Sequence, residues 1–141
     1  MKADNKALLL QLLKQHKELG ISNQIDYDKF YLYSIITHST AIEGSTVTEV
    51  EAQLLFDEGI TAKGKPMVEQ LMNLDLKNAY EYGREWIKNH EDITIDTLIL
   101  LASKVMARTG SEYNSLGGHF DASKGELRKL NVTAGAGGGL Y

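Results

Sequence analysis

The chain of 141 residues has no cysteine, a single proline and no long apolar run, and each scarcity narrows what it can be. Without cysteine, disulfides and thiolate metal sites are excluded, although the redox compartment stays open. The leucine-rich block at residues 8–13 is short and interrupted by Gln11, so it predicts neither a signal peptide nor a membrane span. We therefore expect a cytoplasmic protein.

A basic surface is missing as well. The net charge is −4 and the pI is near 5.5, which gives no footprint for nucleic acid, and no basic amphipathic helix indicates a membrane surface. The remaining composition is ordinary, with 43% hydrophobic and 24% charged residues in 15.7 kDa, and it indicates a globular protein about one domain long. We expect neither a nucleic-acid partner nor a membrane partner.

Helical periodicity covers most of the sequence, so we predict a mainly α fold of about six helices. The expected helices are residues 5–19, residues 27–44, a helix opened by the Thr46/Glu49 capping-box pattern and closed by Gly59, a helix from Pro66 to about His90, and a helix from Thr94 to Gly110. The last is strongly apolar and is expected to be the most buried. In the third helix, Val50, Leu54 and Leu55 are expected to face inward. Asp26 and Thr94 are expected to cap the helices that follow them.

The helix over residues 27–44 carries an oddly placed acid. At 100° per residue, one side of this helix holds Leu32, Ile35, Ile36, Ser39, Ile42 and Glu43. Glu43 thus lies where leucines lie, and a buried carboxylate needs a cationic or hydrogen-bonding partner. The alternative, which the pattern by itself favours, is that Glu43 reaches water or caps a neighbouring helix.

Two features complete the pattern. Asp75 interrupts the apolar face of the helix that starts at Pro66, and a structural hydrogen bond explains it better than catalysis does. After Gly110 the helical periodicity is lost, so we predict a loop over residues 111–118. Residues 129–133 alternate as a short strand would, which predicts a β hairpin near the C-terminus.

Residues 39–44, Ser-Thr-Ala-Ile-Glu-Gly, resemble the (S/T)xxxE(G/N) inhibitory motif of Fic-domain proteins, and residues 41–48 resemble the family's continuation of that motif. The resemblance implies that Ser39 is the motif's hydroxyl, Glu43 its inhibitory glutamate and Gly44 its small residue. In intact relatives the inhibitory glutamate pairs with an arginine of the catalytic signature and blocks productive placement of the ATP γ-phosphate.

A second stretch resembles the family's flap, a G-x-x-R-x-x-x-V segment leading to a small hairpin. Gly125, Arg128 and Val132 occupy the matching positions. In the family, the flap backbone lines the nucleotide and aligns the target's hydroxyl-bearing residue as an added strand. The resemblance therefore implies four nucleotide-side flap residues: Val132, Thr133, Ala134 and Gly135.

The family transfers AMP from ATP to a Ser, Thr or Tyr hydroxyl of a target protein and releases pyrophosphate. It does so with a histidine base and an Mg²⁺-holding acid in the signature HxFx(D/E)GNGRxxR. Around His119 the chain echoes this signature faintly, but the His–Phe spacing is wrong and Gly-Asn-Gly-Arg is absent. We therefore assign no catalytic residue and no metal ligand.

The signature normally follows the flap, and here the sequence stops at Tyr141. We expect the N-terminal part of a Fic protein: a helical region over residues 1–60 that contains the inhibitory helix, and the first part of the Fic core over residues 61–141, an incomplete Fic-like fold. The intact protein is then a self-inhibited AMP-transferase that uses ATP and Mg²⁺ and docks an unknown target protein at the flap. The 141-residue chain alone is expected to transfer no AMP. The sequence leaves open whether the protein forms a homo-oligomer.

Two other hypotheses compete with this one. The chain could act as a non-enzymatic helical inhibitor of a separate Fic partner, as an antitoxin does. An all-α binding domain with coincidental matches ranks last.

Overall fold

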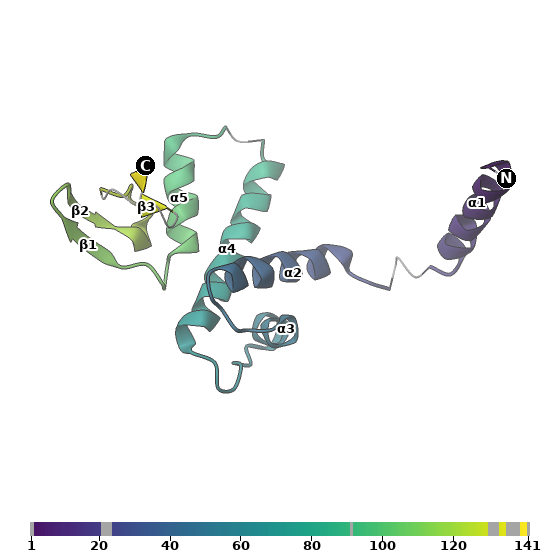
Figure 1. Ribbon diagram of the computed structural model, residues 1–141, viewed down its shortest axis with the longest axis horizontal. Coiled ribbons are helices and arrows are strands. Elements are labelled where there is room, and N and C mark those ends of the chain that lie inside the picture. The colour runs from purple at the N-terminus through teal and green to yellow at the C-terminus, as the bar shows by residue number, and fades with distance from the viewer. Residues whose placement is uncertain (1, 21–23, 91, 130–132, 135–138, 141) are drawn as a thin grey trace.

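The computed structural model describes residues 2–20, 24–90, 92–129, 133–134 and 139–140. These residues form five α-helices and two short antiparallel hairpins (Figure 1). The helices are α1 (Lys2–Glu18), α2 (Tyr27–Ile42), α3 (Glu49–Glu58), α4 (Met67–Lys88) and α5 (Ile95–Val105). Strand β1 (Glu112–Ser115) pairs with β2 (Gly118–Asp121), the 3-10 turn η2 (Ala122–Lys124) follows, and β3 (Thr133–Ala134) pairs with β4 (Gly139–Leu140). The predicted mainly α fold with a short β hairpin near the C-terminus is confirmed, with five α-helices in the described residues where about six were expected.

Helix starts follow local hydrogen-bonding rules. Asp26 accepts a hydrogen bond from the Lys29 N–H at 2.9 Å and so caps α2, and Thr94 caps α5, as the sequence predicts. In α3 the predicted capping box is wrong by two residues, because Thr48 and Glu51 form it. Thr46, the threonine of the predicted pattern, instead donates hydrogen bonds to Glu69 in α4.

The centre of the molecule is where α2, α3 and α4 meet. Figure 1 shows α2 crossing α4, α3 lying next to both, and α5 running beside α4 on the other side. In the described residues, the buried apolar side chains are Ile36, Val47, Ala52, Leu55, Ala62, Ala79 and Phe120, and the buried polar side chains are Thr37, Thr40, Ser45, Gln70, Asn73, Asp75 and Asp121, of which Phe120 and Asp121 belong to β2. Polar residues thus contribute much of what is buried between the helices, and hydrogen bonds satisfy them there.

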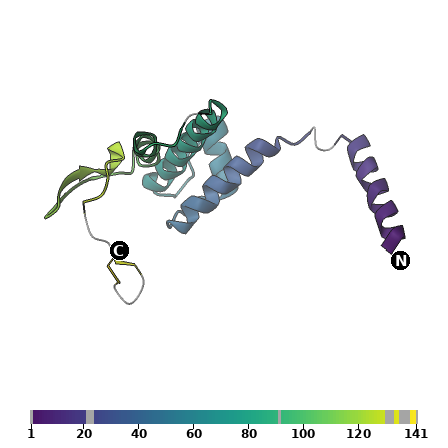
Figure 2. The same ribbon diagram turned by 90° about the horizontal axis from the view of Figure 1, so that it is seen from above.

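Helix α1 stands apart from this group in both views (Figures 1 and 2). The leucines at positions 8–13 of this helix remain 49–58% exposed. No helix in the described part of the chain is both long enough and apolar enough to cross a membrane.

The buried side of α2 differs from the predicted one. Of the six residues of the predicted stripe only Ile36 is fully buried, and Ile42 is 84% exposed. Thr37 and Thr40 are buried instead. Their hydroxyls donate to the backbone one turn earlier and to Asn73 in α4, which removes the cost of burying them. A count of apolar positions cannot detect this compensation.

Two further burial predictions are wrong. Helix α5, expected to be the most buried, contains no fully buried residue, and Ile95 and Leu98 are 68% and 52% exposed. It packs against both α4 and η2, and these contacts leave the outer part of the helix exposed. In α3, Leu55 is buried as predicted, but Val50 is 69% exposed.

Residues 111–118 were predicted to form a loop and instead contain β1 and the turn into β2. Tyr113 and Phe120 face each other across this ladder, with ring centroids 5.0 Å apart in a stacked arrangement. Such aromatic cross-strand pairs help to stabilise a two-stranded hairpin. Side-chain hydrogen bonds add to it, among them those of the Ser115 hydroxyl to the carbonyls of Gly118 and Lys129.

Candidate functional site

The end of α2 forms one wall of an open groove of about 530 Å³. The first half of α4 and the residues that end α5 form its other walls. The lining residues are Ser39, Thr40, Glu43, Val68, Met72, Leu76, Val105, Met106 and Thr109. Because the other lining residues are apolar or carry hydroxyl groups, Glu43 supplies the groove with its one charged side chain.

The structure places Ser39 and Glu43, the two motif residues with polar side chains, along the same groove. Ser39 is half-buried, and Glu43, one helical turn later, is exposed at the rim of the same groove. Among the described residues, neither side chain takes part in a hydrogen bond or an ion pair. Glu43 thus reaches solvent, the arrangement that the helical pattern by itself favours. Its carboxylate remains available to a cation that approaches the groove.

Gly44, the third motif residue, has a backbone reason to be glycine. Its φ angle is +97°, in the region that L side chains rarely adopt. The turn closes with two backbone bonds, from Gly44 N–H to the carbonyl of Ala41 at 3.0 Å and from Ser45 N–H to the carbonyl of Thr40 at 3.0 Å. The chain therefore reverses directly after Glu43, as a glycine C-terminal to a helix allows.

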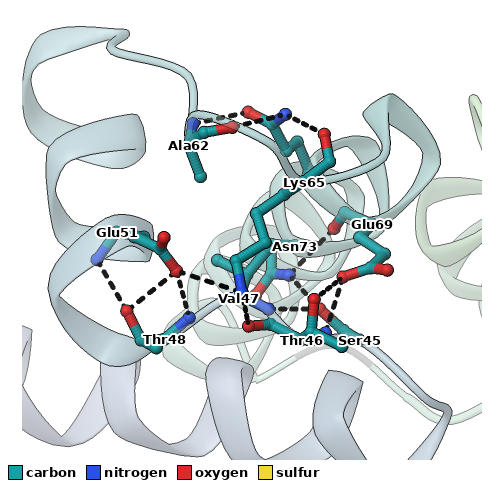
Figure 3. A network of polar contacts seen from close by, with 10 residues as sticks. Ser45, Thr46, Val47, Thr48, Glu51, Ala62, Lys65, Glu69 and Asn73 are labelled. Carbon is teal, nitrogen blue, oxygen red and sulfur yellow. Dashed lines mark hydrogen bonds and ion pairs between the residues drawn. The ribbon is translucent and has the colours of Figure 1, made fainter.

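Polar side chains tie the segment after this turn to α4 (Figure 3). The Thr46 N–H and hydroxyl both donate to Glu69 Oε2, at 2.6 and 2.8 Å, and Lys65 Nζ donates to the Thr46 carbonyl at 2.7 Å. The hydrogen bond from the Thr46 backbone, with that from its hydroxyl, holds the pKa of Glu69 below its ordinary value. In the same way the backbone and hydroxyl of Thr48 lower the pKa of Glu51.

Asn73 in α4 holds the turn from the inside (Figure 3). Its Oδ1 accepts from the Thr40 hydroxyl at 3.0 Å, and its Nδ2 donates to Ser45 Oγ at 3.2 Å and to the Glu69 carbonyl at 2.9 Å. Sequence reasoning missed both Asn73 and Thr40. The available signal was an asparagine in the interior of a long helix, where its side chain competes with the backbone unless it has another partner.

The structure describes only part of the predicted flap. Val132 and Gly135 lie outside the described residues. Thr133 and Ala134 form β3, which pairs in antiparallel register with Leu140 and Gly139 of β4. Of the flap residues that the structure describes, neither lines the groove at Ser39 and Glu43.

The groove can also be compared with what ATP and Mg²⁺ require. A nucleoside triphosphate is a polyanion, whereas the groove offers it no cationic side chain and one carboxylate. In the described part of the chain, no three His, Asp or Glu side chains are placed to share a metal ion. These residues by themselves do not fit ATP with Mg²⁺.

The comparisons with known proteins leave the chain unassigned. No protein-family model, curated protein or solved structure matches it.

Proposed function

We propose that this chain is the regulatory N-terminal part of a self-inhibited Fic-type protein AMP-transferase, with Glu43 as its inhibitory residue. The observation that supports the proposal is the shared position of Ser39 and Glu43. Both line one open groove, and the Glu43 carboxylate has no partner in the described residues. A free carboxylate at a groove rim is suited to bind an arginine in a charge-assisted, bidentate pair.

Because the groove residues alone do not fit ATP, the proposal assigns ATP binding to the catalytic signature and a blocking role to Glu43. In the proposed intact enzyme, Glu43 pairs with an arginine that would otherwise bind the ATP phosphates, and in doing so it presents like charge to them. Ser39 lies one turn away in the same groove, and the resemblance implies a supporting role for its hydroxyl in the intact enzyme. Transfer of AMP then requires that this pair be broken first, so inhibition depends on Glu43 and not on a change of fold.

The test uses the intact gene product that carries the HxFx(D/E)GNGRxxR signature, incubated with ATP labelled at the α-phosphate. Glu43→Gly is expected to raise self-labelling by about tenfold or more, within the usual range of coupling between sites. The matched control is Glu58→Gly, which replaces an exposed acid at the end of α3. Equal labelling of wild type and Glu43→Gly would overturn Glu43 as the inhibitor.

The second candidate, a helical inhibitor of a separate Fic partner, predicts a different result. The 141-residue chain would then lower labelling by that partner when added in trans, and the Glu43→Gly chain would not. The absence of the catalytic signature from these residues is the observation that keeps this candidate in view.

A further inference from the structure

One buried side chain of α4 holds both ends of the turn that carries Glu43. Thr40 precedes the turn and Ser45 follows it, and each is hydrogen bonded to Asn73 through its hydroxyl. Thr40 is 1% exposed and Asn73 is fully buried. Residues 41–44 therefore extend from a pair of contacts that both end on one amide group.

The orientation of this amide follows from its partners. The Glu69 carbonyl can only accept, so the atom 2.9 Å from it must be the Nδ2 donor and the atom facing Thr40 must be Oδ1. Both Nδ2 hydrogens are then used, one for Glu69 and one for Ser45, and Oδ1 accepts from the Thr40 hydroxyl. The single hydrogen of that hydroxyl is shared with the Thr37 carbonyl, 3.1 Å away. The Asn73 side chain has no spare donor, and no other side chain of the same size offers this combination.

From this geometry we infer that Asn73 is a positioning residue for the inhibitory glutamate, an inference that rests on the proposed function. Hydrogen bonds are directional, so those that join Asn73 to Thr40 and Ser45 fix the turn relative to α4 more closely than apolar contacts do. By fixing Thr40 and Ser45, Asn73 sets where Glu43 stands relative to the groove. Without the amide contacts the Glu43 carboxylate is still present but is no longer held at the groove, so inhibition weakens.

The experiment measures ATP self-labelling of the intact, signature-bearing protein in variants of Asn73 and Thr40. Asn73→Ala and Thr40→Val are expected to raise labelling by about fivefold, the lower end of typical coupling between sites. Thr40→Ser keeps the hydroxyl and is expected to restore wild-type labelling. The matched control is Thr37→Val, which removes a buried hydroxyl one turn earlier that bonds only within α2.

Two further readouts separate positioning from a general loss of structure. In a Glu43→Gly background, Thr40→Val is expected to add no further labelling. Thr40→Val acts by displacing the Glu43 carboxylate, and the Glu43→Gly protein no longer has that carboxylate. Amide hydrogen exchange at Gly44 and Ser45 is expected to quicken in Thr40→Val and not in Thr37→Val. Labelling is expressed per folded molecule, as measured by circular dichroism.

The outcomes are distinguishable. If Glu43→Gly raises labelling while Thr40→Val and Asn73→Ala match wild type, the positioning role is wrong and the proposed function stands. Activation by Thr37→Val to the same extent would also overturn it, because any loosening of α2 would then suffice. If Glu43→Gly itself leaves labelling unchanged, the proposed function fails and this inference fails with it.

Discussion

Arg108 contacts both carboxylate oxygens of Asp75. Its backbone N–H donates to Asp75 Oδ2 at 2.7 Å, and its Nε lies 2.9 Å from Oδ1. Asp75 is fully buried in the middle of α4, whereas the Arg108 side chain is 42% exposed. The structural hydrogen bond predicted for this acid is confirmed. The contact anchors the segment after α5, and with it Val105, Met106 and Thr109 of the groove wall.

Replacing Asp75 with alanine therefore leaves a part-buried backbone N–H without its acceptor. We expect a loss of about 1–3 kcal/mol in the free energy of unfolding, rather than the larger loss for a fully buried ion pair, since the guanidinium can return to water. Urea denaturation measures the change. Asn78→Ala, at an exposed position one turn further along α4, is the control and should change stability by less than about 0.5 kcal/mol. A similar small effect for Asp75→Ala would show that the contact is not needed.

Two glycines with the same backbone angle provide a second prediction. Gly59 and Gly125 both have φ +71°, but a Cβ at Gly59 would meet open space, whereas one at Gly125 would lie 2.1 Å from the Ile99 carbonyl oxygen. Gly59→Ala should cost about 1–2 kcal/mol for its left-handed conformation. Gly125→Ala carries the same conformational cost and must also push η2 away from α5.

Thermal and urea unfolding of the two alanine variants test this pair. The difference between them isolates the close approach of η2 to α5, because the conformational contribution is common to both. Equal stabilities would mean that the two elements separate at no cost.

The sequence predicts what depends on neighbours along the chain and misses what depends on contacts across it. The caps by Asp26 and Thr94 were predicted because each needs only a residue three positions away. The buried face of α2 was not, because Thr40 is satisfied by Asn73, which lies 33 positions away. Periodicity counts apolar side chains and has no means of anticipating a threonine whose partner arrives from another helix.

The same distinction, between features local in sequence and contacts between distant residues, applies to the candidate site. Residues 39–44 were found by resemblance, and the structure adds that Ser39 and Glu43 line one groove and that Gly44 needs its positive φ angle. The side chains that hold this turn, Asn73 and Glu69, carry no motif. Their role follows from the position of α4 against the turn.

A third prediction concerns acid. The Asp121 carboxylate accepts from the Ser123 hydroxyl at 2.6 Å and lies 2.9 Å from Lys124 Nζ, and these contacts lower its pKa from the ordinary 3.8 to about 2. A carboxyl whose pKa is lower in the folded state contributes stability that is complete above its unfolded pKa and is lost as the pH falls through the folded value.

Asp121→Asn should therefore be less stable than wild type at pH 7, and the difference should shrink between about pH 4 and pH 2. Chemical denaturation at a series of pH values measures it. Asp92→Asn, which replaces an exposed acid by its amide, is the control. A gap between wild type and Asp121→Asn that stays constant down to pH 2 would contradict the assignment.

The last prediction compares two leucines. Leu12 in α1 is 52% exposed, whereas Leu55 in α3 is 6% exposed within the core. Leu55→Ala removes buried methyl groups and leaves a cavity, so it should cost about 2–4 kcal/mol. Leu12→Ala should change the stability by less than about 0.5 kcal/mol, because a half-exposed side chain on a helix that stands apart has little burial to lose. If Leu12→Ala proves as costly as Leu55→Ala in urea denaturation, α1 must bury its leucines in solution, and a dependence of the midpoint on protein concentration would then identify a second copy of the chain as the partner.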